Sequence, residues 1–163
     1  MNARKPAPEI AVLLHLLDEA FDRKAWHGPN LFGAVRRLPP EEAAWRPAPG
    51  RHSVQDLALH CAYWKYAVRR KLTGEKRGSF PRKGSNFFPR EGAAALAAWK
   101  ADLAILRAEH AKLRAAVAAF PPKRLRSRAP GSRHSYLRLI AGAAAHDLYH
   151  AGQIRLLSRL RPE

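Results

Sequence analysis

Two of the eight histidines have the spacing that lets a helix present both of them to one metal ion. His146 and His150 are four residues apart, and no other two histidines in the chain are. On a helix, side chains at i and i+4 share a face with Cβ atoms about 5–6 Å apart, so both imidazoles can reach a single ion. A pair of this kind is more often exposed or part of a core, so the spacing needs support from other residues.

A third histidine occupies a matching position in another segment. His60 lies between Leu57 and Trp64 on the apolar face of a predicted helix. The residues around His146 and His150 also indicate an internal face, so the three imidazoles can meet where two helices pack together. Three neutral nitrogen donors leave a coordination position open for water or substrate, as in catalytic metal sites. The alternative for His60 is a core histidine that is hydrogen-bonded to a backbone carbonyl.

The segments that must position these histidines have helical periodicity, and none alternates as a strand would. Prolines, glycines and N-cap residues divide the chain into four long predicted helices and one short one, with a further turn at Pro39. The long helices are expected at about 8–24, 53–72 and 91–120 and from Ser135 onward, and the short helix at 31–38. We therefore predict an all-α fold, a four-helix bundle that forms a single domain over residues 1–163.

A long connection separates the second and third of the long predicted helices. It covers residues 74–90 and carries three phenylalanines. Connections of this length are uncommon in compact domains unless they have a function, and phenylalanine side chains favour burial. We interpret residues 74–90 as a functional loop or lid.

The composition limits the classes of protein to which the chain can belong. Its 163 residues include 30 Lys and Arg against 13 Asp and Glu, and one cysteine, Cys61. A single cysteine forms no internal disulfide and favours a reducing compartment, and we interpret Cys61 as a buried thiol outside the histidine site. No segment has the apolar core of a signal peptide or about 18 apolar residues for a membrane span. We expect a cytoplasmic protein that does not enter membranes.

The formal net charge of +17 raises the alternative of nucleic-acid binding. The basic residues gather in clusters, the densest of which is 123–128. No zinc finger, aromatic RNA-binding motif or basic zipper accompanies them. We therefore expect nonspecific attraction to polyanions rather than recognition of a nucleotide sequence.

The segments around the histidines resemble the DinB/YfiT-like superfamily of damage-inducible helical proteins. Residues 46–64 include His60, and residues 146–154 read HDLYHAGQI. The resemblance extends over essentially the whole chain, and the combination of the three histidines is its most specific part. It implies a four-helix bundle, often a homodimer, in which His60, His146 and His150 hold a divalent metal such as zinc or nickel.

The resemblance also implies a class of reaction. Members of the superfamily include transferases and isomerases that use low-molecular-weight thiols such as bacillithiol, mycothiol or glutathione. We therefore expect a metal-dependent hydrolase or a thiol-dependent transferase acting on a small electrophilic substrate. The alternative is a stress-response bundle that binds a metal or another ligand without turnover.

Several residues near the histidines are candidates for catalysis or substrate binding. Asp147 follows His146 as glutamate does in H-E-x-x-H hydrolases, so it is the candidate general base. The alternatives are a solvent-facing residue and a side chain that supports a metal ligand. Trp64 and Tyr149 are candidate walls of a substrate pocket, although aromatic residues at helical spacing are more often core. Gln153 is a candidate for orienting a ligand, and Arg69 for binding an acidic group. The alternative for Gln153 is a hydrogen bond within the bundle, and the alternative for Arg69 is a position on a solvated basic surface.

Overall fold

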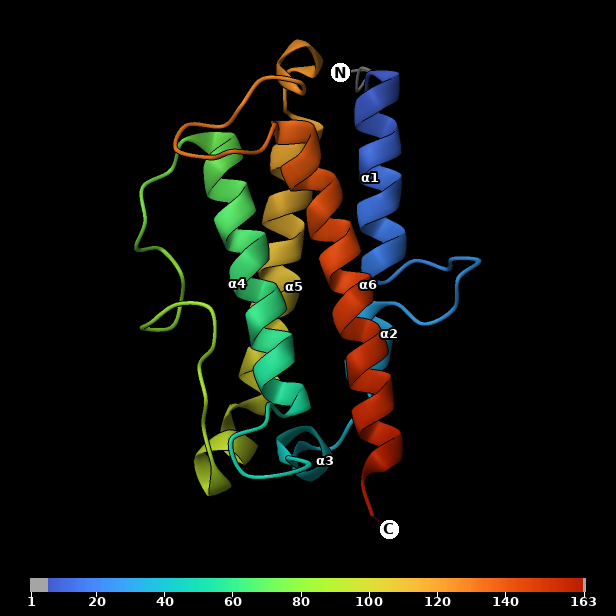
Figure 1. The fold of residues 1–163 in the computed structure, drawn as a ribbon, viewed down its shortest axis with the longest axis vertical. Coiled ribbons are helices and arrows are strands. Elements are labelled where there is room, and N and C mark those ends of the chain that lie inside the picture. Colours follow the sequence, from blue (N-terminus) through green and yellow to red (C-terminus); the bar gives the residue numbers. More distant parts are fainter. Residues whose placement is uncertain (1–5, 163) are drawn as a thin grey trace.

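The computed structural model describes residues 6–162, and these residues form helices and connections without a strand. Two isolated bridges, Ser85 to Phe87 and Arg128 to Ser135, are their only β-type pairings. The α-helices, drawn in Figure 1, are α1 (Pro8–Phe21), α2 (Leu31–Val35), α3 (Pro40–Ala44), α4 (Val54–Thr73), α5 (Gly92–Ala118) and α6 (Tyr136–Leu160), and a 3-10 turn covers Pro122–Arg124. The prediction of an all-α fold is confirmed. Residues 1–5, the start of the segment examined for a signal peptide, lie outside the described residues.

Local capping sets the start of the two helices that carry the histidines. Ser53 accepts a hydrogen bond from the backbone N–H of Asp56, whose carboxylate accepts one from the N–H of Ser53. This reciprocal capping box begins α4 where the sequence predicts. Ser135 begins α6 with a single cap, its hydroxyl accepting a hydrogen bond from the N–H of Arg138. The register of every histidine on these helices follows from the two serines.

Three helices end earlier than the sequence predicts. α1 ends at Phe21 rather than near residue 24, because the N–H groups of Asp22 and Arg23 both bond to the carbonyl of Asp18. The side-chain amide of Asn30 donates a hydrogen bond to the backbone carbonyl of Arg23. This carbonyl therefore has a partner although the helix does not continue. α2 ends at Val35 rather than 38, and α5 ends at Ala118 rather than 120.

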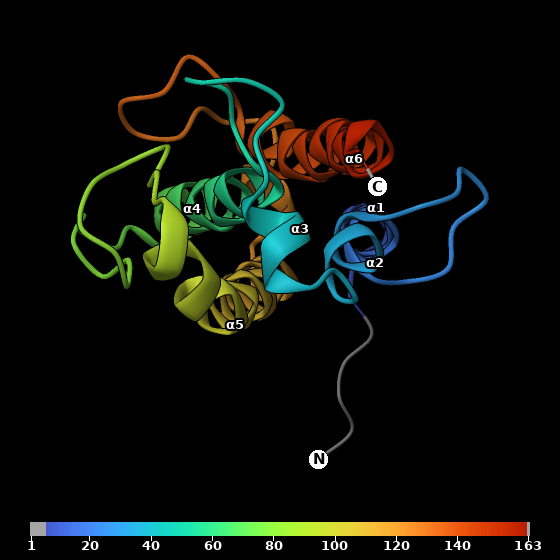
Figure 2. The ribbon, with the colours of Figure 1, turned by 90° about the horizontal axis from the view of Figure 1, so that it is seen from below.

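The four long helices lie side by side along the long axis of the molecule (Figure 1). α4 packs against α5 and α6, and α1 packs against α5 and α6, so each long helix has two long neighbours. Seen from below, α3 covers one end of this arrangement (Figure 2), and α2 lies beyond the lower end of α1, where it packs against α6. Their buried apolar side chains form two clusters, one at each end of the helices. The histidine-bearing faces of α4 and α6 meet between these clusters.

The connection between α4 and α5 is fixed to the helices by charge. Asp102 of α5 is fully buried and accepts hydrogen bonds from Arg82 and Arg90 of this connection and from Gln55 of α4. A buried carboxylate needs such partners, because desolvation without them is costly. Phe88 is buried, as the sequence predicts, and Phe80 and Phe87 are half-buried. The connection therefore has a defined path over α4.

No described helix is both long enough and apolar enough to cross a lipid bilayer.

Candidate metal centre

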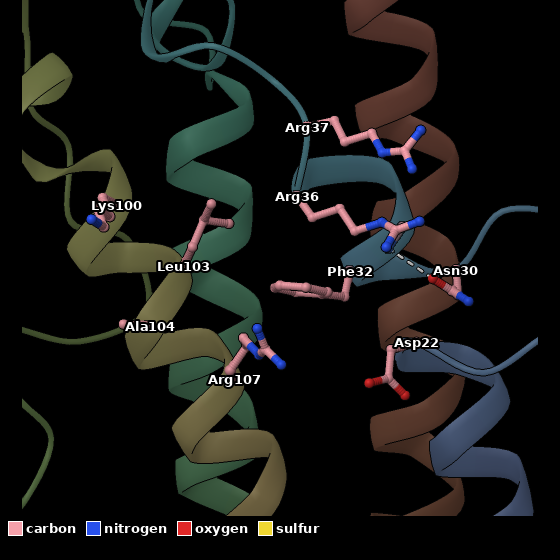
Figure 3. Close-up of a pocket in the computed structure, with 10 residues that line it drawn as sticks. Asp22, Asn30, Phe32, Arg36, Arg37, Lys100, Leu103, Ala104 and Arg107 are labelled. Atoms are coloured by element: carbon pink, nitrogen blue, oxygen red, sulfur yellow. Dashed lines mark hydrogen bonds between the residues drawn. The ribbon is translucent and has the colours of Figure 1, made fainter.

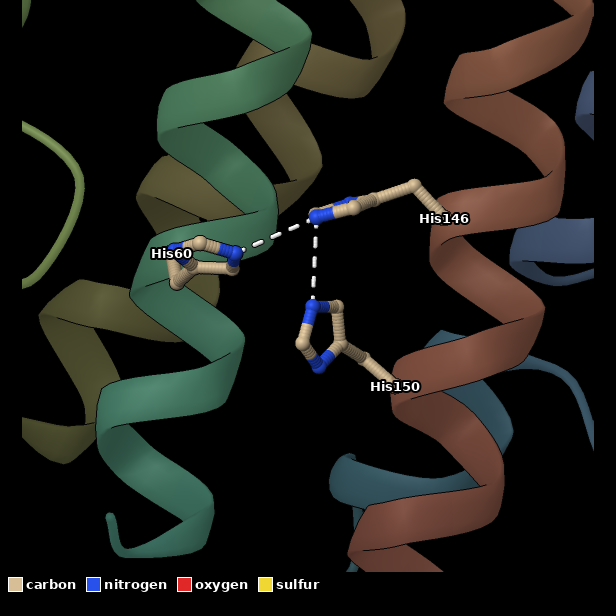
Figure 4. A group of neighbouring side chains, drawn as sticks. All are labelled: His60, His146 and His150. Carbon is tan, nitrogen blue, oxygen red and sulfur yellow. Dashed lines mark hydrogen bonds between the residues drawn. The ribbon is translucent and has the colours of Figure 1, made fainter.

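Three imidazoles converge between α4 and α6. Nε2 of His146 lies 3.1 Å from Nε2 of His60 and 3.1 Å from Nε2 of His150 (Figure 4). His60 comes from α4, and the other two come from successive turns of α6. The prediction that the i, i+4 pair meets a third histidine from a facing helix is thus confirmed as a geometric arrangement.

The outer nitrogens of two of these rings are held by oxygen acceptors. Nδ1 of His60 donates to the backbone carbonyl of Asn86 at 3.1 Å, and Nδ1 of His150 donates to Oε1 of Gln153 at 2.7 Å. Because a carbonyl oxygen only accepts, each Nδ1 must carry the hydrogen in these contacts. In the neutral rings, the Nε2 lone pairs of His60 and His150 are therefore directed toward the cluster.

Burial and mutual repulsion keep the three rings neutral. Desolvation, followed by the charge of His150, lowers the pKa of His60 to about 4. Desolvation and the two neighbouring histidines lower the pKa of His146 to about 3. Burial also lowers the pKa of His150, against the opposing effect of its hydrogen bond to Gln153. At neutral pH the cluster offers unprotonated nitrogens, which is the form that binds metals.

The donor set fits a divalent metal. Ligands about 2.0–2.1 Å from a tetrahedral ion are separated from one another by about 3.3 Å, close to the 3.1 Å contacts measured between the Nε2 atoms. Because the Nε2 lone pairs of His60 and His150 both point inward, a single Nε2–H on His146 cannot form a full hydrogen bond to both of them at once. The three histidines could therefore hold a metal ion and leave at least one coordination position free.

Asp147, the candidate general base, is directed into the protein interior. Its side chain is fully buried and forms an ion pair with Lys65 of α4, which is also buried. Burial raises the pKa of Asp147 to about 6, and the ammonium of Lys65 opposes that rise. Asp147 also lies within 4.8 Å of ligand atoms of Cys61 and His146, which makes a second, deeper group of possible donors. The carboxylate of Asp147 is therefore paired with Lys65 behind the three imidazoles.

Cys61 is fully buried, as the sequence predicts, but it does not lie apart from the histidines. Its Sγ is within 4.8 Å of ligand atoms of His146 and Asp147, because α4 turns this position toward α6. Desolvation raises the pKa of its thiol well above the ordinary value, and the charge of Asp147 adds to that effect. A thiol in such surroundings stays protonated and unreactive.

Aromatic side chains border the histidines. Trp64 is 42% exposed, packs edge-on against His60 and His146, and donates its indole N–H to Oδ1 of Asn86 at 2.9 Å. Tyr149 is 64% exposed and lies edge-on to His150. The structure thus brings both candidate pocket walls to the cluster, together with Gln153.

Arg69 lies elsewhere. Its guanidinium forms ion pairs with Glu75 and with the buried carboxylate of Glu109, the latter at 3.4 Å. It also lies over the ring of Tyr66. The structure therefore gives Arg69 a place in a network between α4 and α5 and does not bring it to the histidines.

Three residues that were not predicted from the sequence complete the border of the cluster: His52, Asn86 and Phe87. Phe87 stacks between His60 and His52, with ring centroids 4.3 Å and 3.8 Å from the two imidazoles. Asn86 precedes Phe87 and has a positive φ of 63°, which turns its carbonyl and side chain toward α4. Asparagine tolerates this conformation better than most residues, so an Asn-Phe pair in a long connection was the available signal.

Two grooves lie next to the cluster: one includes His146 itself, and the other includes Gln153, which is hydrogen-bonded to His150. One, of about 280 Å³, includes Trp64 and His146 in its lining, with Val68, His134, Arg138, Leu139, Gly142 and Ala143. The other, of about 250 Å³, includes His52 and Gln153, with Pro47, Arg51, Leu57, Leu156 and Leu157. Both volumes lie just below the range of about 300–1,000 Å³ that pockets for small ligands have.

Helical architecture and a three-histidine cluster together define the class of protein. The model of the DinB superfamily matches residues 25–154, well over half of the chain and all three histidines. The chain belongs to the DinB superfamily. Among curated proteins and among solved structures, no significant match to the chain is found.

Proposed function

We propose that His60, His146 and His150 hold a divalent metal, zinc or nickel, and that the protein is an enzyme acting on a small electrophilic substrate. The observation that carries this proposal is the convergence of three Nε2 atoms while two of the Nδ1 atoms donate to oxygen acceptors. A metal bound there would lower the pKa of a water or thiol and so supply a nucleophile at neutral pH. Membership of the DinB superfamily supports the same proposal.

The position of Asp147 favours transfer from a thiol over hydrolysis. A hydrolase of the H-E-x-x-H kind uses a carboxylate as general base, but the carboxylate of Asp147 is buried against Lys65. A thiol needs less help to ionise, because free thiols have a pKa near 8.5 and water has one near 15.7. We therefore propose a low-molecular-weight thiol as the co-substrate.

The chain's own residues orient the metal ligands and border the substrate. The carbonyl of Asn86 and the amide of Gln153 fix the rotation of two imidazoles. Trp64 stands at the groove that contains His146, where its exposed ring can contact an apolar part of the substrate. Tyr149 has the corresponding position beside His150.

A second candidate function is binding of a metal or ligand without turnover. The burial of Asp147 favours it, because no other acidic side chain among residues 6–162 is grouped with the three histidines. The two candidates differ in one observable, which is turnover of an electrophile in the presence of an added thiol.

Two further parts of the proposal concern assembly. We propose that the four long helices form the four-helix bundle of the family and that the protein is a homodimer in the cytoplasm. Tyr149, Leu156 and Leu160 of α6 are each more than half exposed, which suits a surface that a second copy covers. Light scattering at working concentration tests the dimer, and the mass of one chain would contradict it.

The decisive experiment is elemental analysis of protein purified without a histidine tag. We expect about one metal per chain, and its loss in the triple variant His60→Ala, His146→Ala, His150→Ala. His15→Ala is the matched control, because His15 is exposed and lies on α1. The absence of metal from wild-type protein, even after reconstitution, would contradict the proposal. A thiol-dependent release of chromophore from an aryl halide, lost in the triple variant, separates the enzyme from the binding protein.

A further inference from the structure

A large cavity lies apart from the histidines. It has a volume of about 710 Å³ and is lined by the end of α1, by α2 with the residues on either side of it, and by α5 (Figure 3). The lining residues are Asp22, Asn30, Phe32, Gly33, Arg36, Arg37, Lys100, Leu103, Ala104 and Arg107. None of them lines either groove at the histidine cluster.

Four cationic side chains stand on two walls of this cavity. Arg36 and Arg37 follow α2, and Lys100 and Arg107 come from α5. Lys100 and Arg107 are seven residues apart and so share a face of the helix. Ala104 lies between them, and its small side chain leaves the space open.

These four cations have no anionic partner among residues 6–162. None of them forms an ion pair, whereas the buried carboxylates Asp56, Asp102, Glu109 and Asp147 all do. Asp22 is the single carboxylate in the lining, so three net positive charges remain around one concavity. Like charges in a concave site raise the potential there and attract anions.

The walls are held in place by packing. The ring of Phe32 lies 5.4 Å from the ring of Phe21. The guanidinium of Arg107 lies over the face of the Phe32 ring, 5.0 Å from its centroid. Figure 3 shows Phe32 extending from α2 toward α5, with Arg107 on one side and Arg36 on the other. A side chain that is already ordered loses less entropy when it binds a ligand.

A close contact fixes the start of α2 as well. Oδ1 of Asn30 accepts the N–H of Gly33 at 2.8 Å, and a Cβ at position 33 would lie 2.6 Å from the same oxygen. Glycine is therefore required for the capping contact that orients α2, and with it Arg36 and Arg37, toward the cavity.

We propose that this cavity binds a small molecule that carries a chain of two or more phosphate groups. Two cations on each of two walls call for an anion with more than one charged group, and the arginine fork matches phosphate oxygens. The volume lies within the range of about 300–1,000 Å³ that small-ligand pockets have, so the site suits a discrete ligand rather than an extended polymer. The phosphate chain belongs either to an inorganic oligophosphate or to a nucleotide.

The test is calorimetric titration of the full chain with inorganic triphosphate at an ionic strength of about 0.15 M, where surface charges are screened beyond about 8 Å. We expect the double variant Arg36→Gln, Arg107→Gln to weaken binding about tenfold or more. Arg126→Gln, Arg128→Gln is the matched control, because these two arginines are exposed as Arg36 and Arg107 are but do not line the cavity. This control should bind within about twofold of wild type, and Asp22→Asn should bind more tightly.

Triphosphate also binds metals, so the same titration is made with the variant His146→Ala, His150→Ala. Unchanged affinity supports the cavity, and lost affinity overturns it. Equal losses in the pocket variant and the control overturn it too, because they indicate general attraction to positive charge, and so does the absence of binding to wild type. A nucleoside triphosphate in place of inorganic triphosphate distinguishes the two sources, since only a site for nucleotides binds it more tightly.

Discussion

Lys65 of α4 and Asp147 of α6 form an ion pair in which each side chain is only 1% exposed. The pair joins the two histidine-bearing helices directly behind the three-histidine cluster. Removal of one partner leaves an uncompensated charge in the interior, which costs about 3–5 kcal/mol. We therefore expect Lys65→Met and Asp147→Asn each to lower the free energy of unfolding by that amount in urea denaturation.

The double variant Lys65→Met, Asp147→Leu is the control for this prediction. It removes both charges and fills the space with apolar atoms, so it should recover most of the lost stability. A single variant within about 1 kcal/mol of wild type would contradict the role of the pair.

The sequence held a signal for this pair. Lys65 lies four residues after Cys61 and seven before Leu72, on the apolar stripe of α4. A lysine on such a stripe requires an acid from a facing helix. The sequence could not show which acid, because that depends on how α4 and α6 pack.

The parts of the site that could be predicted are those that depend on residues close together in the sequence. Helix starts at Ser53 and Ser135 and the i, i+4 relation of His146 and His150 depend on neighbouring residues, so the sequence predicts them. The contacts of His60 with Asn86 and Phe87 join residues 26 and 27 positions apart through an irregular connection. No periodicity specifies such contacts, because they depend on the path of the chain and on the anchoring of that path to Asp102.

The hydrogen bond from His150 Nδ1 to Gln153 should strengthen metal binding. An acceptor at Nδ1 fixes the ring and makes Nε2 more basic, and loss of such a partner typically costs 10- to 100-fold in metal affinity. We expect Gln153→Ala to show a loss of this size in competition with a chromophoric chelator, while Gln153→Glu, which retains an acceptor, binds at least as well as wild type. Equal affinity in Gln153→Ala and wild type would contradict the prediction.

A buried histidine outside the three-histidine cluster makes stability depend on pH. His110 of α5 stacks on Phe21 with ring centroids 3.7 Å apart, and burial, followed by the charge of Lys65, lowers its pKa from 6.5 to about 3. Between these values the unfolded chain binds a proton that the folded chain does not. The free energy of unfolding therefore falls as the pH drops from about 6.5 toward 3, by up to about 1.4 kcal/mol per pH unit for this one group.

The variant His110→Phe isolates that contribution. It keeps an aromatic ring against Phe21 and removes the buried Nδ1, which has no partner among the described residues. We expect the plot of unfolding free energy against pH to become shallower by about one proton between pH 4 and 6. His15→Gln is the matched control, because the side chain of His15 is 71% exposed. An unchanged slope in His110→Phe would show that His110 is not kept neutral by the fold.

The anchoring of the connection between α4 and α5 to Asp102 leads to the last prediction. Arg82 and Arg90 both form ion pairs with this buried carboxylate. Asp102→Asn keeps the shape of the side chain but removes its charge, so the two arginines lose their partner and the connection should open more often. We expect trypsin to cut the variant faster than wild type within residues 74–91, as followed by mass spectrometry.

Metal affinity should fall in the same variant, because the connection carries the carbonyl of Asn86 that orients His60. Asp18→Asn is the control for both measurements. It breaks the ion pair of Asp18 with Arg114 and leaves the connection untouched, so neither cutting within residues 74–91 nor metal affinity should change. If Asp102→Asn opens the connection but binds metal as well as wild type, then Asn86 does not support His60, and α4 and α6 alone position the three imidazoles.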